Sequence, residues 1–344
     1  MDVATLRQQL KKTTPATIYL VLGTQHVLQE QARAAFSHLI PEEEKVMNVG
    51  SYDMEMTPVA TAIDDAASAP FFGERRLVMV DKPYFLTGER HPGGPDHDLK
   101  ALLNYLKHPQ PTTVLVFFAP YEKLDGRKAL VKQLKKSAVN VSAAPLNESS
   151  ARSAIKSRLA GDGYEIDPAA MTELIKRTNA DFGLMSANVE KLELLAYQDR
   201  EITVEQVQGI VPQTLDDNVF DLVNAVLAKN QERALSLYQQ LLANQEPPLR
   251  INAVLVGQFR LLMQVKILSA RGLSQGTLAS RLTVHPYRVK LALRTVRRFS
   301  LTNLEDAFLG LLKIEEALKT TNRDPALLFQ LFMLRYSHSQ VSWR

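Results

Sequence analysis

The sequence contains no cysteine among its 344 residues, and this absence excludes several kinds of site. Disulfide bonds, thiolate nucleophiles and zinc sites built on cysteine ligands are all impossible in this chain. Long apolar runs are also missing, since no stretch approaches the roughly 20 residues that cross a bilayer. The first residues, MDVATLRQQLKK, lack the apolar segment of a signal peptide. We therefore expect a cytoplasmic protein with no membrane partner.

The composition is that of a soluble globular protein, with 45% hydrophobic and 23% charged residues. A length of 344 residues is too great for one hydrophobic core and suits two or three domains. The formal net charge of +4 is unevenly distributed. From Arg250 to Arg298 the chain carries ten Arg or Lys residues and no Asp or Glu. This asymmetry indicates a polyanion or an acidic protein surface beside the C-terminal third.

The first 143 residues alternate strand-like and helix-like segments, which is the pattern of a parallel sheet covered by helices. The strand-like segments are TIYLVLG, KVMNVG, RRLVMV, TTVLVFF and VNVSA. We therefore predict one doubly wound α/β domain over residues 1–143, with a five-stranded parallel sheet.

The rest of the chain has helical patterns. Residues 144–212 are predicted to form a small helical domain, in which Thr203 and Gln206 have the spacing of a capping box. Residues 213–344 are predicted to be all-helical, because apolar residues recur every three or four positions. The fold class is thus α/β plus all-α, in three domains.

A nucleotide site is missing from the place where such an α/β domain would carry one, after the strand TIYLVLG. Phosphate binding there requires several glycines, a Lys for the β and γ phosphates, and a Ser or Thr for magnesium. In the segment that follows this strand, Gly23 is the only glycine, and Gln25 to Leu28 provide no lysine. No Gly-Lys pair occurs anywhere in the chain. We expect no nucleotide hydrolysis and no cofactor.

Other titratable residues do not indicate a catalytic or metal site. Among the seven histidines only His91 and His97, in the loop HPGGPDH, have a spacing that a metal could use, and a solvated loop is the simpler interpretation. Asp64 and Asp65 could suggest a two-metal pair. Their helical surroundings, AIDDAAS, favour a solvated helix face instead. We predict no catalytic residues and no metal.

Two adjacent phenylalanines lie in the short segment SAPFFGERR. Phe71 and Phe72 follow Pro70 and precede Gly73, in a segment that is too punctuated for a core helix or strand. Because adjacent side chains point in different directions, at least one ring has no obvious core to enter. Two interpretations stay open: a ring caps the domain's own core, or the pair is exposed as an anchor for a partner.

A family resemblance is carried by stretches spread over essentially the whole chain. They are IYLVLG, APFFGERRLVMV, DFGLMSANVEKLELL, NVFDLVNAVLAKNQERALSLYQQLL, QFRLLMQVKIL, HPYRVKLALR and TNRDPALLFQLFML. In these stretches the sequence resembles the delta subunit family of the bacterial DNA polymerase III clamp loader.

The resemblance implies an AAA+-like architecture: a P-loop-type domain, a small three-helix lid domain and a C-terminal helical collar domain. It implies a subunit that binds and opens the sliding clamp without binding ATP itself. Its partners would be the sliding clamp, the ATPase subunits (gamma/tau) and delta-prime in a hetero-pentamer, and primer-template DNA through the complex. Classification as a nucleotidyltransferase would then belong to the DNA polymerase holoenzyme, because the subunit has no catalysis of its own.

The resemblance also implies roles for particular residues. Phe71 and Phe72, with Pro70 before them, match the apolar pair that enters a pocket on the clamp. The strand LVMVD ends in Asp81, like a magnesium-binding strand of an ATPase, but Lys82 follows where a catalytic glutamate would be expected.

The helix RVKLALRTVRRF carries the densest basic cluster. Its apolar residues are predicted to form one buried stripe, consisting of Val289, Ala292, Leu293, Val296 and Phe299. The other face gathers Lys290, Arg294, Arg297 and Arg298. This basic face either contacts DNA or a partner's collar, or is merely solvated.

Two alternative functions remain at this point. One is an ATP-hydrolysing subunit of the same loader, against which the missing lysine after Gly23 argues. The other is a stand-alone DNA-binding regulator that uses the basic C-terminal domain and would bind DNA tightly without partners.

Overall fold

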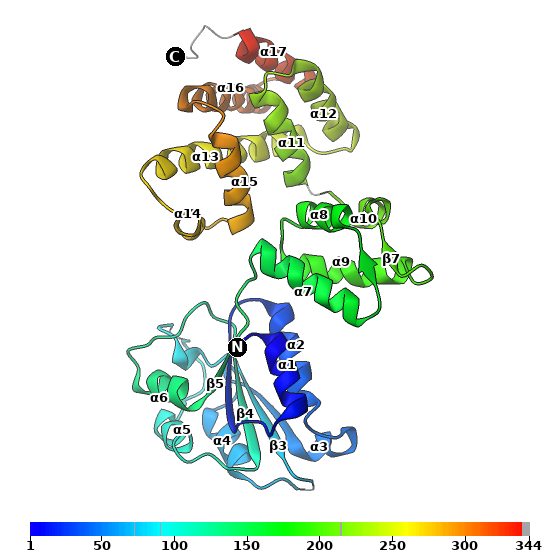
Figure 1. The fold of residues 1–344 in the computed structure, drawn as a ribbon. Helices are drawn as coiled ribbons and strands as arrows, with labels where there is room; N and C mark the ends of the chain where they lie inside the picture. The colour runs from blue at the N-terminus through cyan, green and yellow to red at the C-terminus, as the bar shows by residue number, and fades with distance from the viewer. Residues whose placement is uncertain (72, 90, 214, 339–344) are drawn as a thin grey trace. The chain divides into compact units, whose positions relative to one another are not determined.

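The computed structural model describes residues 1–71, 73–89, 91–213 and 215–338, and the chain forms two compact units (Figure 1). The first unit spans Met1–Leu146 and the second spans Asn147–Arg344. The further division of the second unit at residue 212 stays a prediction.

Five parallel strands form the sheet of the first unit, in the order β2-β3-β4-β1-β5. They are β1 (Ile18–Leu22), β2 (Val49–Asp53), β3 (Arg76–Asp81), β4 (Thr113–Ala119) and β5 (Val139–Ser142). The predicted parallel five-stranded sheet is confirmed. One predicted segment is wrong in part, because KVMNVG is not all strand. The 3-10 turn η1 (Glu42–Glu44) continues into a one-turn helix, α3 (Lys45–Asn48), and β2 starts only after it.

Helices cover both faces of this sheet, as in a doubly wound domain (Figure 1). Side chains of β1 alternate between the faces, because successive residues of a strand point to opposite sides. Ile18 and Leu20 join the core formed with α4 (Val59–Ala67), α5 (Leu99–Tyr105) and α6 (Ala129–Ser137). On the other face, the Tyr19 ring meets Phe36 edge to face at 4.8 Å. Phe36 belongs to α2 (His26–Ser37), which packs beside α1 (Val3–Lys12). A second 3-10 turn is η2 (Tyr84–Leu86).

The second unit begins with four helices, one more than the resemblance implied. They are α7 (Glu148–Gly161), α8 (Pro168–Arg177), α9 (Phe182–Leu195) and α10 (Val204–Ile210), with a short parallel pair, β6 (Glu165–Ile166) and β7 (Glu201–Ile202). The capping box predicted from Thr203 and Gln206 is confirmed at the start of α10. The extra helix, α10, follows directly from that cap.

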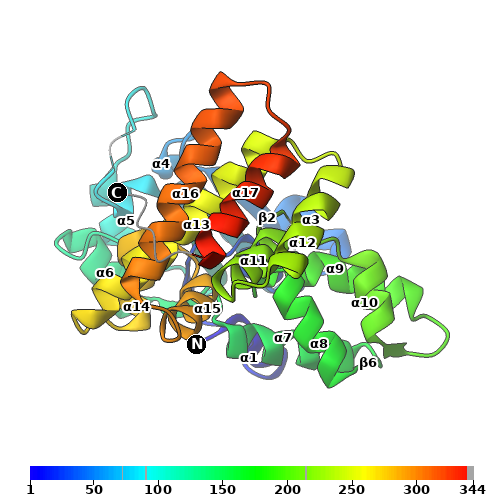
Figure 2. The ribbon, with the colours of Figure 1, turned by 90° about the horizontal axis from the view of Figure 1, so that it is seen from above.

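Seven helices make up the rest of the unit within the described residues, so the predicted all-helical C-terminal region is confirmed. They are α11 (Leu215–Leu227), α12 (Gln231–Ala243), α13 (Pro248–Ala270), α14 (Gln275–Leu282), α15 (Pro286–Val296), α16 (Leu301–Thr320) and α17 (Pro325–His338). The long helix α13 packs against α11, α15 and α16 (Figure 2).

By length and composition α13 is apolar enough to cross a membrane, so our statement that no such segment exists was too broad. Half of its most apolar window is buried inside the protein. Its buried residues, among them Ile251, Leu255 and Phe259, belong to the core of the helical region, which explains why the helix is apolar.

Candidate partner-binding site

The Phe71 segment forms a loop between α4 and β3 in the first unit. The Phe71 ring is 64% exposed, whereas its backbone is held firmly. The backbone N–H of Phe71 donates to Oδ1 of Asn48 across 2.8 Å, and Asn48 is fully buried. Pro70 is half-buried, and Phe72 lies outside the described residues. For Phe71 the interpretation as a core cap is wrong, since its ring faces solvent.

Arg76, the first residue of β3, ties this loop to α4. Its Nε donates to Oδ1 of Asp65 across 2.7 Å, and its Nη1 donates to the carbonyl of Ala69 across 3.3 Å. We predicted that Asp65 lies on a solvated helix face, and this prediction is wrong. Asp65 forms a largely buried ion pair with Arg76. Gly73 has a φ of +75°, a left-handed conformation that favours glycine. The loop is thus fixed by three side-chain contacts and one glycine turn.

Two further exposed apolar side chains lie at the same edge of the sheet. Val46 is 88% exposed and Met47 is 53% exposed, both on α3. This helix precedes β2 and the Phe71 loop precedes β3, which are neighbouring parallel strands. Both segments therefore lie at the amino edge of the sheet, joined by the bond from Phe71 to Asn48. We call Val46, Met47 and Phe71 the amino-edge patch.

The sequence analysis missed Val46 and Met47, because it assigned their segment, KVMNVG, to a strand. A usable signal was present in the preceding run of charge, PEEEK, which starts the turn that α3 continues. On a one-turn helix, Asn48 can point inward while the two residues before it point outward. The charged run therefore indicates a turn before β2, whereas the burial of Asn48 and the exposure of the pair are findings of the structure.

The turn between β1 and α2 is closed by hydrogen bonds within the protein. The backbone N–H of Gly23 donates to the Ala119 carbonyl across 3.1 Å, and that of Gln25 donates to the Ala143 carbonyl across 2.9 Å. The buried Gln29 side chain donates to the Gly23 carbonyl across 2.6 Å. A phosphate site at this position needs inward-pointing N–H groups, and two of them are already bound to carbonyl oxygens.

The backbone after β5 approaches Gly23 very closely. A Cβ atom placed there would lie 2.0 Å from the carbonyl carbon of Ala143. Glycine is therefore required at this position by the contact with the chain after β5, whatever the role of the turn. The single glycine of the sequence pattern has a packing explanation.

The carboxylate at the end of β3 is neutralised by a cation. Arg33 of α2 forms an ion pair with Asp81, and its guanidinium lies 4.2 Å from the centre of the Phe118 ring. Lys82, the next residue, donates to Asp53 across 2.8 Å and to Glu55 across 2.7 Å. These hydrogen bonds raise the pKa of Lys82 above its usual value. A magnesium ion at Asp81 would have to displace Arg33.

The two histidines with possible metal spacing are used in packing. His97 accepts at Nδ1 from the backbone N–H of Val59 across 3.0 Å, and its Nε2 lies 3.0 Å from the Tyr84 hydroxyl. Burial lowers the pKa of His97. Across the described ranges, His, Asp and Glu side chains form no group of three suited to a metal ion.

The predicted apolar stripe of α15 is confirmed in its main part. Val289, Ala292 and Val296 are buried, and Leu293 and Phe299 are partly buried. The helix ends at Val296, however, so Phe299, Arg297 and Arg298 lie beyond it and not, as predicted, on its faces. The basic residues do not act as one free face. Lys290 pairs with Glu148 of α7, whereas the side chains of Arg294, Arg297 and Arg298 are exposed.

Comparison with known proteins agrees with this architecture. The sequence profile described as DNA polymerase III, delta subunit, matches residues 19–144, and the one for the C-terminal domain of that subunit matches residues 216–336. Together they cover the sheet of the first unit and the helices from α11 onward.

Three related proteins are informative. The DNA polymerase III subunit delta of Bacillus subtilis is 35% identical over 329 residues, which cover 95% of each chain. The solved structure of the Bacillus subtilis DNA clamp loader delta protein superposes with a TM-score of 0.74 at 34% identity, and covers 97% of this chain and 99% of that one. The replication factor C large subunit of Methanosphaera stadtmanae is 23% identical over 249 residues, which are 71% of this chain and 43% of that protein.

An AAA+-like α/β unit followed by a helical unit, with this structural match, defines a clamp-loader subunit of the DNA replication machinery. Within that class, the chain belongs to the DNA polymerase III delta subunit family.

Proposed function

We propose that this delta-family chain binds the sliding clamp through its amino-edge patch and opens it without binding ATP itself. The observation that carries the proposal is the Phe71 ring, which is 64% exposed on a loop whose backbone is fixed by Asn48. An apolar ring presented on a rigid loop loses little conformational entropy when it enters a pocket. Residues of this kind form the hot spots of protein interfaces.

The size of the patch supports a contact broader than one ring. Val46 and Met47 lie on α3, beside the loop that carries Phe71. Exposed apolar side chains that gather at one edge of a domain mark interaction sites more often than scattered ones do. Phe72 belongs to the proposed anchor by sequence, together with Pro70.

The lack of ATP binding is supported by the β1–α2 turn and by Asp81. The N–H groups of Gly23 and Gln25 are bound to carbonyl oxygens, and the Asp81 carboxylate is paired with Arg33. These contacts argue against the alternative of an ATP-hydrolysing subunit. The work of clamp opening would then come from binding energy and from ATPase partners, and the chain itself would catalyse no reaction.

The proposed assembly is a cytoplasmic hetero-pentamer with the gamma/tau ATPase subunits and delta-prime. The helices from α11 to α17 would provide the collar contacts, since they form one apolar core with an excess of basic residues. Arg294, Arg297 and Arg298 are exposed cations that would contact primer-template DNA or a partner's collar. Lys290 contributes less, because Glu148 already compensates its charge.

Unloading of the clamp tests the proposal directly. Purified sliding clamp is placed on nicked circular DNA, the isolated chain is added without ATP, and the release of clamp is followed by gel filtration. We expect release to depend on the concentration of this chain and to be slowed strongly by Phe71→Ala. The proposal would be contradicted if clamp release required ATP, or if the unaltered chain and the Phe71→Ala variant released the clamp equally fast.

A further inference from the structure

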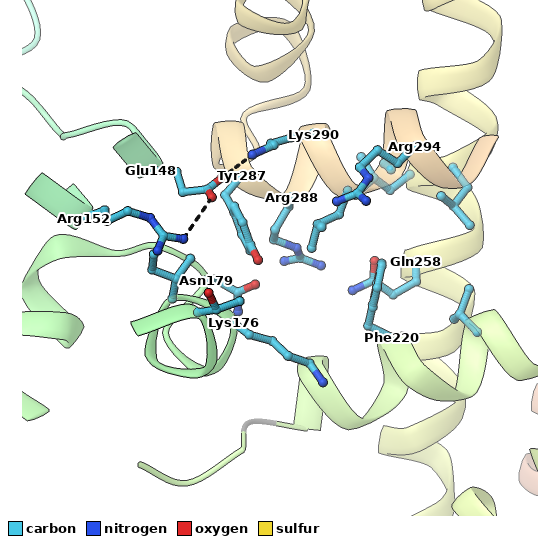
Figure 3. A pocket seen from close by; sticks show the side chains of 17 residues that line it. Glu148, Arg152, Lys176, Asn179, Phe220, Gln258, Tyr287, Arg288, Lys290 and Arg294 are labelled. Atoms are coloured by element: carbon cyan, nitrogen blue, oxygen red, sulfur yellow. Dashed lines mark hydrogen bonds and ion pairs between the residues drawn. The ribbon is translucent and has the colours of Figure 1, made fainter. Parts of the chain in front are cut away.

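The second unit contains a cavity of about 270 Å³ that the proposed function does not use. It lies among α7, α8, α11, α13 and α15 (Figure 3). Apolar side chains form much of its wall, among them Ile175, Val223, Leu261 and Leu291. This volume lies near the lower end of the roughly 300–1,000 Å³ found for pockets that hold small organic ligands. A molecule about the size of a mononucleotide fits better than a polymer segment.

Positive charge predominates around this cavity. Its lining includes the five cationic side chains of Arg152, Lys176, Arg288, Lys290 and Arg294. One carboxylate of the lining, Glu148, pairs with both Arg152 and Lys290, and Lys176 pairs with Asp221 across 3.4 Å. Arg294 forms no ion pair within the described ranges. The cavity therefore suits a ligand that carries negative charge.

A buried amide points into the same space. Gln258 of α13 is only 7% exposed, and its side chain has no hydrogen-bond partner in the part of the chain that the structure describes. Figure 3 shows this amide directed into the cavity from α13, facing the Arg288 guanidinium, which comes from α15. A carboxamide offers both a donor and an acceptor. A ligand that both donates and accepts hydrogen bonds would therefore match this side chain.

We propose that the cavity binds a nucleoside mono- or diphosphate. Arg294 would hold the phosphate oxygens, since a guanidinium group matches phosphate with paired hydrogen bonds. Gln258 would bond the edge of the base, because a carboxamide provides a donor and an acceptor side by side. Phe220 and Tyr287, which both line the cavity, provide aromatic surface for the base. The cations of the wall balance the phosphate charge, so this binding needs no magnesium.

Isothermal titration calorimetry of the intact chain tests this site, with AMP, GMP, ADP and GDP as separate probes at low salt and without magnesium. We expect saturable binding of at least one probe. Arg294→Gln should weaken it by about tenfold or more, because a charge-assisted hydrogen bond is lost. Gln258→Leu should also weaken it, because the amide proposed to bond the base is lost. Arg281→Gln is the matched control, since it removes one exposed charge on α14, outside the cavity.

Three results would overturn the proposal. The first is the absence of saturable heat for all four probes at millimolar concentration. The second is binding that Arg294→Gln and Gln258→Leu leave unchanged. The third is binding of a short single-stranded oligonucleotide that depends on Arg294 while free nucleotides do not bind, which would make the site a DNA contact instead.

Discussion

The side-chain carbonyl of Asn48 accepts a hydrogen bond from the backbone N–H of Phe71, with 2.8 Å between the two atoms. Asn48 is fully buried at the end of α3, whereas 64% of Phe71 is exposed on the loop before β3. A buried polar side chain thus sets the position of an exposed ring. Because the loop is ordered before any partner arrives, the cost of ordering it is already included in the stability of the fold.

Replacing Phe71 by Ala should weaken clamp binding strongly and leave the fold intact. A hot-spot ring contributes about 2 to 4 kcal/mol, so the dissociation constant should rise by about 30-fold or more. The melting temperature should hardly change, because removing an exposed ring leaves no cavity. Calorimetry with purified clamp and a thermal melt of the same variant check both statements. Replacing Phe71 and Phe72 together should cost on the order of 4 kcal/mol, about a thousandfold.

Met56→Ala is the matched control for that experiment. Met56 is 80% exposed, but it follows β2 and so lies at the opposite, carboxyl edge of the sheet. Its removal should leave clamp binding unchanged, whereas Val46→Ser with Met47→Ser should weaken it by about tenfold. If Phe71→Ala binds the clamp as well as the unaltered chain does, the anchor is wrong. If the variant with Val46→Ser and Met47→Ser binds the clamp normally but Phe71→Ala does not, Phe71 remains the anchor and the two α3 residues do not contact the clamp.

Replacing Asn48 by Ala should loosen the Phe71 loop without touching the ring. The Phe71 amide loses its acceptor, so its hydrogen exchange should become faster and clamp affinity should fall by about fivefold to tenfold. Ser68→Ala is a suitable control, since it removes a hydroxyl of the same loop that contacts only the Asp64 carbonyl. Unchanged exchange at Phe71 in the Asn48 variant would show that the bond does not order the loop.

The isolated chain should neither bind magnesium-ATP at the β1–α2 turn nor hydrolyse it. The N–H groups of Gly23 and Gln25 are occupied by carbonyl oxygens, and Asp81 is paired with Arg33. The measurement is a titration of the Arg294→Gln variant with ATP and magnesium. This variant is used because its proposed nucleotide binding in the cavity of the second unit is weakened, so that binding at the β1–α2 turn is measured separately. A stoichiometric, magnesium-dependent site in that variant would refute the prediction.

A fragment that ends at Val211 should bind the clamp but fail to join the ATPase subunits. The amino-edge patch is retained in this fragment, whereas α11 to α17 and their core are removed. Size-exclusion chromatography with the purified partners distinguishes the two properties. Normal co-elution of the fragment with the ATPase subunits would contradict the assignment of the collar.

The stability of the first unit should fall in mildly acidic solution because of His97. Burial lowers the pKa of His97 below its ordinary value of 6.5, because desolvation disfavours the charged imidazolium. Between the lowered pKa and 6.5 the unfolded chain binds more protons than the folded chain. The free energy of unfolding therefore decreases as the pH falls through this range.

Amide exchange of β3 and β4, corrected for intrinsic rates, measures this effect at about pH 7.5 and about pH 5.5. His97→Asn keeps an acceptor near the position of Nδ1 but does not titrate, so its stability should depend less on pH. An equal dependence in the variant and in the unaltered chain would assign the effect to other groups.

Local patterns in the sequence determined the elements of both units with few errors. The alternation in TIYLVLG and TTVLVFF, the Thr203–Gln206 spacing and the three-to-four periodicity after residue 213 all act over a few neighbouring residues. The lack of lysine and glycines after β1 was also readable, because a phosphate loop is a continuous segment. These features needed no knowledge of distant contacts.

Only the tertiary structure decided which side chains are presented and which are neutralised. The bond between Asn48 and Phe71 joins residues 23 positions apart, and the pair of Lys290 with Glu148 joins residues 142 positions apart. The exposure of Val46 and Met47 depends on a single helical turn that the short apolar run did not distinguish from a strand. The cavity around Gln258 is formed by five helices, so no local pattern encodes it. Such contacts join residues that are far apart in the chain. They depend on how the whole chain packs, so no short segment of the sequence predicts them.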